Sequence, residues 1–341
     1  MNMQESNQAD IMNLALGSTF LATGGGFPFE QKLKKLTELN QTNSLNIINS
    51  DELDDDSFVC AVCGIGSADN DGVFDLEKAL EVGLSQIEGL TNKRIQAIIP
   101  GEIGIENIVF DIASQINLPV LDGDTAGGRA VPEMKQDTFV LANESILPAV
   151  IVTLEGKTKV VNLSEDEKNI EKIARKMAVE SPGKTVLLFS HIKPMKKIRE
   201  IASLNSLTTA INVGKILQMK TLRTIQDEFR YYLKGEIIMK EIVIDVVKQN
   251  DMGFLVQKVK LGNGQELVIK NEIIGIIDEK KIIQSVPDSI CIIRQKKFTP
   301  IHSSELQPND KILIFRIPPI EQWKSDYAQE IFGRNYLQQL L

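Results

Sequence analysis

The sequence predicts a two-domain α/β protein. An N-terminal α/β domain with a mostly parallel sheet is expected over residues 1–163, and a C-terminal α+β domain rich in antiparallel strands over residues 164–341. Helical and strand patterns alternate in the first half, which is typical of βαβ units. After Gly235, short β-branched runs follow one another, which indicates antiparallel strands. Between the two parts, residues 165–179 have the pattern of a charged amphipathic helix that would separate the domains.

The N-terminal half begins with two helices around a glycine loop. Apolar residues recur at helical spacing over residues 8–22, and Gly24-Gly25-Gly26 then ends this helix. Pro28 suits the first turn of a second helix through Leu39. Further helices are expected at 75–87 and 105–115, and buried strands at 45–48, 58–62, 94–99 and 118–121. In sheets of this kind, ligands bind at the carboxyl ends of the strands.

The second half is expected to be mainly β. Short strands are predicted between Phe139 and Val161, and a helix at 207–219. Gly262-Asn263-Gly264 is a hairpin signal, and a last helix is expected near residues 327–340. The predicted strands of this half are 237–247, 254–261, 266–269, 273–277, 282–285, 289–293 and 311–317.

The composition restricts the classes of function. The chain has 341 residues, 43% of them hydrophobic, so it can bury sizeable cores. Its 46 Asp and Glu residues outnumber 38 Lys and Arg residues without any basic tract, which argues against nucleic acid as a partner. The first residues lack a signal-peptide pattern, and no apolar run approaches the roughly 20 residues of a membrane helix. We expect a cytoplasmic protein without membrane contact, a homo-oligomer, and a small-molecule substrate.

Histidine and cysteine are too few to dominate the chemistry. The chain has three Cys and two His, and a four-ligand zinc site would consume most of them. Cys60 and Cys63 lie three apart on a strand-like run, where such residues point to opposite faces. We expect them and Cys291 to be free thiols in a reducing cytoplasm. His191 and His302 are isolated in sequence, so carboxylate, amide, hydroxyl and guanidinium groups remain for the chemistry.

Two candidate phosphate-binding motifs are incomplete. Ser181-Pro-Gly-Lys-Thr185 ends like a phosphate-binding loop, but Ala178 occupies the position of the required glycine, and the motif precedes a strand. Gly64-Ile-Gly66 follows a strand, but Asp69 stands in place of the third glycine of a dinucleotide fingerprint. We interpret it as a tight turn at a strand end, which would help to wall a ligand cleft.

Polar residues concentrate after two of the predicted strands. Pro100-Gly-Glu-Ile-Gly-Ile-Glu-Asn107 follows one strand, and Asp122-Gly-Asp-Thr-Ala-Gly-Gly-Arg-Ala-Val-Pro-Glu133 follows the next. Parallel neighbours bring both strand ends to one edge of the sheet, where free backbone N–H groups bind anions or carbonyl oxygens. Each side chain also has a purely structural interpretation, such as a turn or a local ion pair. Together they predict one cleft that holds Glu102, Glu106, Asn107, Asp122, Asp124, Arg129 and Glu133.

These stretches resemble a known family. The glycine-rich start Leu16-Gly-Ser-Thr-Phe-Leu-Ala-Thr-Gly-Gly-Gly26, the PGEIG-x-EN stretch and the DGD-x-x-GGRA-x-PE stretch are similar to the DUF917 family, also named for the S-methyl thiohydantoin desulfurase domain and associated with hydantoinases. The resemblance continues through the second half, at residues 270–272, 286–290, 308–314 and 332–333. The family usually carries Gly-Gly/Ala-Pro after Gly64, whereas this chain has Gly64-Ile-Gly-Ser-Ala68.

The resemblance implies chemistry on a five-membered cyclic amide or thioamide ring. We expect Glu102 to be the general base, with Asp124 second, because burial among like charges raises a carboxyl pKa. Arg129, backbone N–H groups, or a divalent cation such as Mg²⁺ or Mn²⁺ held by Asp122, Asp124 and Glu133 would polarise the carbonyl. The residues expected to bind substrate are Gly24, Gly25, Gly26, Gly101, Glu106, Asn107 and Gly123.

Alternatives remain open at this point. The second hypothesis is a non-catalytic subunit that binds a small polar ligand or docks a hydantoinase-type enzyme. The excess of carboxylates at the strand ends favours catalysis over this alternative. A third hypothesis, phosphoryl transfer from a nucleotide, has less support than the other two, because the sequence contains no phosphate-binding loop. The Gly24–Gly26 stretch also has the simpler interpretation of a loop that ends a helix.

Overall fold

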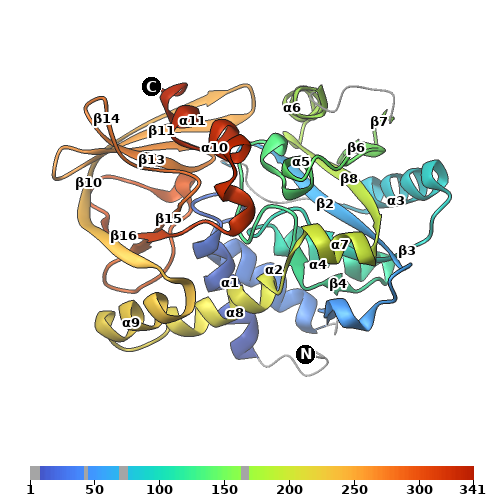
Figure 1. Ribbon diagram of the computed structural model, residues 1–341, viewed down its shortest axis with the longest axis horizontal. Helices are drawn as coiled ribbons and strands as arrows, with labels where there is room; N and C mark the ends of the chain where they lie inside the picture. Colours follow the sequence, from blue (N-terminus) through green and yellow to red (C-terminus); the bar gives the residue numbers. More distant parts are fainter. Residues whose placement is uncertain (1–7, 42–44, 69–75, 163–168) are drawn as a thin grey trace.

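Two seven-stranded sheets with helices packed between and around them form the molecule (Figure 1). The computed structural model describes residues 8–41, 45–68, 76–162 and 169–341. Within these ranges, no helix is both long enough and apolar enough to cross a membrane. The predicted fold class is confirmed: a mixed, largely parallel sheet is followed by an antiparallel one.

The first sheet has the strand order β1-β4-β3-β2-β8-β6-β7. Its first four strands run parallel, and β8, β6 and β7 each run antiparallel to their neighbours. Helices separate β2, β3 and β4 in sequence, as the pattern predicted, whereas β6 and β7 follow each other directly. Their bounds are β1 Ile47–Ile48, β2 Phe58–Gly66, β3 Ile95–Pro100, β4 Val120–Leu121, β6 Ala149–Thr153, β7 Thr158–Val161 and β8 Thr185–Pro194.

Helices cover both faces of this sheet. Neighbouring residues of β2 face different clusters: Cys60 packs with α3 (Glu77–Thr91) and α4 (Glu106–Ile116), whereas Ala61 packs with α6 (Ile170–Glu180) and α7 (Met195–Ile201). Cys63 packs against the second cluster, so the expected separation of Cys60 and Cys63 is confirmed. The three cysteines are free. The start of the helix expected at 165–179 lies outside the described residues.

Strand β8 extends the first sheet and changes one expectation. It inserts between β2 and β6, so residues after 163 complete the first sheet. The Gly64-Ile-Gly66 stretch is not the tight turn that we expected. It extends β2, because Ile65 and Gly66 pair with Val186 and Thr185 of β8. A partner strand that arrives from more than 100 residues away therefore decides the conformation of this stretch.

The second sheet is antiparallel throughout, in the order β14-β13-β12-β11-β10-β16-β15. The long strand β10 joins its two parts by pairing with β16 near its start and with β11 near its end. The last helix is split into α10 (Asp326–Phe332) and α11 (Arg334–Gln338). The strands are β10 Glu236–Asp251, β11 Phe254–Leu261, β12 Glu266–Lys270, β13 Glu272–Asp278, β14 Lys281–Ser285, β15 Ser289–Arg294 and β16 Lys311–Ile317.

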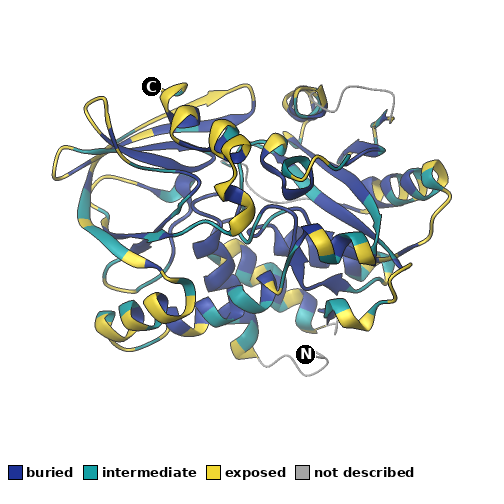
Figure 2. Cartoon of the chain, in the orientation of Figure 1, coloured by how far each residue is buried: buried dark blue, intermediate teal, exposed yellow. Residues whose placement is uncertain are grey.

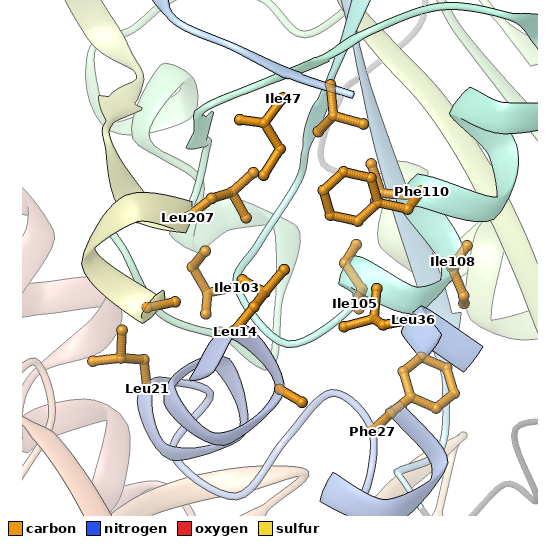
Figure 3. Close-up of a cluster of buried hydrophobic side chains, with 14 of the residues drawn as sticks. Leu14, Leu21, Phe27, Leu36, Ile47, Ile103, Ile105, Ile108, Phe110 and Leu207 are labelled. Atoms are coloured by element: carbon orange, nitrogen blue, oxygen red, sulfur yellow. The ribbon is translucent and has the colours of Figure 1, made fainter. Parts of the chain in front are cut away.

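Helices α1 (Gln8–Leu21) and α8 (Ser206–Leu217) cross between the sheets. The crossing is close because glycine occupies both contact points: a Cβ on Gly17 would lie 1.7 Å from the Ala210 carbonyl oxygen, and one on Gly214 would lie 2.0 Å from that of Asn13. The interior formed here is buried (Figure 2). It belongs to a large apolar cluster that includes α2 (Phe29–Gln41) and the start of α4 (Figure 3).

The remaining short elements link these layers. Helix α9 (Leu222–Leu233) leads into β10, and its Phe229 ring lies 5.0 Å from the rings of both Phe20 and Phe315. This aromatic triad joins α1 and α9 to the second sheet. A small ladder pairs β5 (Gly123–Asp124) with β9 (Ser203–Leu204). Helix α5 (Thr138–Leu141) lies where short strands were expected to begin.

Candidate active site

Two adjoining cavities share one wall at the carboxyl ends of β2 and β3. Their volumes are about 60 and about 70 Å³. We name them by the side chains at their far ends: the apolar cavity reaches Phe27 and Ile108, and the polar cavity reaches Arg175 and His191. The lining of each cavity contains both polar and apolar side chains. The shared wall draws on both halves of the chain, and a ligand site at strand ends is what a parallel sheet predicts. The shared residues are Gly64, Gly66, Glu102, Asn271 and Glu272.

Glu102 is held at this wall by the loop that follows β3. Its Oε2 accepts a hydrogen bond of 3.0 Å from the Val131 N–H. The Gly101 N–H donates to the Val62 carbonyl oxygen at 2.8 Å, which fastens the loop to β2. A Cβ on Gly101 would lie 2.0 Å from the Cys63 Sγ, so only glycine permits this approach. Glu102, the first candidate base, therefore lies in a cavity wall with a fixed backbone.

Glu272 faces the same wall from the second sheet. It follows Asn271, which joins β12 to β13 in a left-handed conformation with φ 57°. The Glu272 side chain is buried, and its Oε2 has no hydrogen-bond partner among the described residues. Its Oε1 lies where a side chain on Gly25 would be, 2.1 Å from an ideal Cβ. Sequence reasoning missed Glu272 as a site residue, although the Lys270-Asn-Glu272 stretch belonged to the family resemblance.

The Gly24–Gly26 loop lies against the Glu272 carboxyl group. The Ile273 N–H donates to the Thr23 carbonyl oxygen at 2.8 Å, and the Ser303 N–H donates to that of Gly24 at 2.8 Å. The His302 Nε2 lies 3.1 Å from the Gly26 carbonyl oxygen. Gly26 also lines the apolar cavity. The loop thus docks the first helix onto the second sheet and brings Glu272 to Glu102.

Burial and mutual repulsion set the protonation of the two carboxyls. Burial, with Glu272 the next largest cause, raises the pKa of Glu102 well above its usual range. Burial raises the pKa of Glu272 to about 8, against the opposing effects of Arg175, Arg129 and Lys270. Two carboxyls that share a site do not both ionise readily. At neutral pH the pair therefore holds at least one proton.

Arg175 lines the polar cavity and is held in place by three backbone carbonyl groups. Arg175 donates to the carbonyl oxygens of Gly66 at 3.1 Å, Gly253 at 2.8 Å and Pro132 at 2.9 Å. Its guanidinium lies 3.3 Å from the Phe254 ring centroid. This arginine therefore ties the two sheets together beside the cavity.

A histidine and a cysteine also reach the polar cavity. The His191 Nε2 lies 3.1 Å from Asp137 Oδ1, and its Nδ1 lies 2.8 Å from the Ser190 Oγ. Asp137 and His191 are far apart in sequence, so neither was a candidate from the chain alone. Burial and the nearby carboxylates raise the pKa of the Cys63 thiol well above its usual range. Cys63 therefore stays a protonated thiol in the wall.

Asp122 and Asp124 are engaged in backbone contacts. Asp122 accepts hydrogen bonds from the Leu207 N–H at 2.9 Å and the Thr208 hydroxyl at 2.5 Å, and so caps the start of α8. Asp124 accepts from the Ala126 N–H at 2.6 Å and the Gly128 N–H at 2.9 Å. Burial raises the pKa of Asp124 to about 7. Both side chains shape the loop after β4.

Glu133 belongs to a third set of contacts. It lies 2.5 Å from the Lys270 Nζ, 2.9 Å from the Lys135 Nζ and 2.6 Å from the Tyr336 hydroxyl. Although burial opposes them, these contacts lower the pKa of Glu133 to about 2. Asp122, Asp124 and Glu133 thus have separate partners. The described ranges contain no group of three His, Cys, Asp or Glu side chains placed to hold a metal ion, so the expected divalent-cation site is not assembled.

The other expected site residues contribute to the framework around the cavities. Arg129 donates to the Pro287 carbonyl oxygen at 2.8 Å and lies 4.9 Å from the Phe332 ring centroid. Glu106 forms a buried ion pair of 3.1 Å with Lys32. Gly123 pairs with Leu204 in the small ladder. Of the predicted set, Gly26, Gly101, Glu102 and Glu133 line a cavity, whereas these two cavities are not lined by Gly24, Gly25, Glu106, Asn107, Asp122, Gly123, Asp124 or Arg129.

Comparisons with known proteins give a consistent result. Residues 9–163 match the family model described as S-Me-THD-like, N-terminal domain, and residues 164–338 match S-Me-THD-like, C-terminal domain. No curated protein matches. A crystal structure of a protein from Chromobacterium violaceum is similar in fold, with a TM-score of 0.77, 18% identity, and coverage of 98% of this chain and 96% of that one. Because the two family models together span nearly the whole chain, the protein belongs to the S-Me-THD-like family.

Proposed function

We propose that this protein is a hydrolase-type enzyme that acts on a cyclic amide or thioamide, a hydantoin or S-methyl thiohydantoin-like ring, with Glu102 and Glu272 as its acid–base pair. One observation supports this above all: two carboxyls from different halves of the chain line the same two cavities, and one has an oxygen without a hydrogen-bond partner among the described residues. The family description points to the thiohydantoin ring.

The carboxyl pair suits both halves of such a reaction. On an S-methyl thiohydantoin, the ionised carboxylate takes a proton from water while the water oxygen attacks the ring carbon that bears sulfur. The C–S bond then breaks, and the protonated carboxyl supplies the proton with which methanethiol leaves. One hydrogen of the water ends on the ring nitrogen and one on the sulfur, and the product is a hydantoin. General acid–base catalysis of this kind contributes about 10²–10⁴-fold to a rate.

Glu102 is the preferred base for geometric reasons. It accepts one backbone hydrogen bond and otherwise faces the cavities, whereas both oxygens of Asp124 are turned into their own loop. Glu272, as the protonated partner, is placed to donate a hydrogen bond to a ring heteroatom. In this proposal Arg129 supports the wall, because its Nε and Nη1 donate to the carbonyl oxygens of Ala130 and Pro287.

The test measures turnover and folding in the same variants. Glu102→Gln and Glu272→Gln keep the shape of each side chain and remove its proton transfer, and Glu330→Gln, on the exposed face of α10, is the control. Methanethiol release and ring opening are assayed on S-methyl thiohydantoins and hydantoins. We expect both site variants to fold and to lose about 10²–10⁴-fold in kcat, with the control unchanged. If the parent protein binds such rings but turns none over, the accessory-subunit alternative is correct.

A further inference from the structure

Asp137 differs from the other carboxylates at the far end of the polar cavity. Both oxygens of Glu171 are engaged, Oε1 by the Arg175 Nε at 2.5 Å and Oε2 by the Met134 N–H at 2.8 Å. Glu133 likewise has a cationic or hydroxyl partner on each oxygen. Asp137 lines the same cavity, but its contacts fall on one oxygen only.

The other oxygen of Asp137 is left for a ligand. Oδ1 accepts a hydrogen bond of 2.7 Å from the Phe139 N–H, which caps α5, and lies 3.1 Å from the His191 Nε2. Oδ2 has no hydrogen-bond partner among the described residues. Asp137 is 6% exposed, and a buried carboxylate oxygen without a partner costs free energy. Since Asp137 lines the polar cavity, Oδ2 is available to a hydrogen-bond donor placed there.

The backbone of β8 departs from the regular strand to bring His191 beside Asp137. A β-bulge begins after Ser190, so that two residues of β8 oppose Cys60 of β2. His191 has a φ of 53°, which is uncommon for a residue with a side chain. Its Nδ1 lies 2.8 Å from the Ser190 Oγ, and its ring packs edge-to-face on Phe139 with centroids 5.0 Å apart. A strained residue held by several partners indicates that the position of its ring matters.

The ring of the proposed substrate carries a group that matches Oδ2. A hydantoin has two ring N–H groups, and an S-methyl thiohydantoin has one N–H and one ring nitrogen without hydrogen. Protonated Glu272 can donate to a ring heteroatom, whereas a ring N–H needs an acceptor. Asp137 supplies an acceptor in the cavity that Glu102 and Glu272 also line.

Resting on the proposed function, we infer that Asp137 binds the substrate through an N–H of its ring, and that His191 is a positioning residue for Asp137. The ring would contact Asp137 and the Glu102–Glu272 pair together, since all three carboxyls line the polar cavity. The substrates are then restricted to rings with an unsubstituted nitrogen at this place. A site that binds a substrate N–H rejects the analogue that lacks it, because its buried acceptor is left unpaired.

Asp137→Asn tests the contact without uncapping α5. Asparagine caps a helix about as well as aspartate does. Because the side-chain carbonyl must accept from the Phe139 N–H, the amide nitrogen takes the place of Oδ2. It then offers a donor where the ring N–H needs an acceptor. Asp227→Asn, on the exposed face of α9, is the matched control.

The experiment titrates hydantoin, 1-methylhydantoin and 3-methylhydantoin calorimetrically into the parent protein and both variants. A hydrogen bond to a charged group is worth about 10–100-fold in affinity. At least one methylated isomer should therefore bind the parent about 10–100-fold more weakly than hydantoin does. Asp137→Asn should weaken hydantoin by a similar factor without weakening that isomer, and Asp227→Asn should match the parent. Equal losses on all three rings in Asp137→Asn, or equal affinities of the parent for all three, would overturn the inference.

His191→Asn tests the positioning role. Asparagine tolerates a positive φ but lacks the imidazole that contacts Asp137. It should lose affinity for the same rings as Asp137→Asn, and the double variant should lose no more than Asp137→Asn alone, because both act through one contact. Additive losses, or an equal loss on every ring, would overturn the role of His191.

Turnover separates this inference from the proposed function. S-methyl thiohydantoins are assayed with the parent protein, Asp137→Asn and Glu102→Gln. If the hydantoins bind with the expected pattern but no ring is turned over, the proposed function is wrong and the inference about Asp137 stands. If rings are turned over and Asp137→Asn changes neither affinity nor selectivity, the reverse holds. If no ring binds, both are wrong.

Discussion

Glu272→Gln should raise the stability of this protein while it removes activity, and the gain should depend on pH. A buried glutamate with a pKa raised from its usual 4.5 to about 8 keeps its proton in the folded state under conditions where the unfolded chain releases it. Below about pH 4.5 both states hold the proton and the carboxyl carries no penalty. As pH rises from 4.5 to 8, only the unfolded chain loses it, so the folded state loses stability.

The size of the effect follows from the pKa difference. Each pKa unit corresponds to about 1.36 kcal/mol, so at pH 7 the ionisable carboxyl costs on the order of 3 kcal/mol. This is an upper value, because Glu102 interacts with the same proton. A neutral amide of the same shape avoids the cost. We therefore expect Glu272→Gln to match the parent protein near pH 4.5 and to exceed it by about 1–3 kcal/mol at pH 7.5.

Urea unfolding at a series of pH values measures this difference, with Glu330→Gln as the exposed control. The m-values of parent and variant must agree, so that the change in midpoint reports stability. A difference between Glu272→Gln and the parent that stays constant with pH would refute the reasoning. So would a variant that becomes less stable than the parent as pH rises.

Three further predictions concern groups around the cavities. Glu133→Gln should have the opposite pH dependence, because the Glu133 pKa is lowered to about 2. We expect the variant to lose on the order of 1–3 kcal/mol of unfolding free energy at pH 7, measured in urea, and this loss should disappear as pH falls from 4.5 towards 2. A loss that stays constant with pH would contradict the ion-pair explanation. Asp122→Ala should cost about 0.5–2 kcal/mol by uncapping α8, yet leave the kcat of the folded protein unchanged; a selective loss of kcat would restore Asp122 as a site residue. Thiol titration of the denatured protein without reductant should count three thiols, whereas a count of one would reveal a disulfide.

Local sequence patterns predicted the parts of the site that lie close together in the chain. The apolar run 95–99 and the Gly-Glu that follows it placed Glu102 at the carboxyl end of β3, because strand period and strand ends depend on neighbouring residues. Gly24-Gly25-Gly26 predicted the end of the first helix for the same reason. The alternation of a strand likewise predicted that Cys60 and Cys63 face opposite sides.

Only the tertiary structure decided which carboxyls meet. Asp122 and Glu102 follow neighbouring strands, yet Asp122 turns to the free N–H groups of α8, which begin 85 residues later in the chain. Glu272 reaches Glu102 because its turn docks on the glycine loop, through hydrogen bonds between residues 23 and 273 and between residues 24 and 303. Such pairings depend on contacts between segments far apart in the chain, on which local periodicity has no influence. The sequence by itself therefore determined the sheet edge and the presence of Glu102 there, whereas the packing of the two sheets supplied its partner and the shape of the cavities.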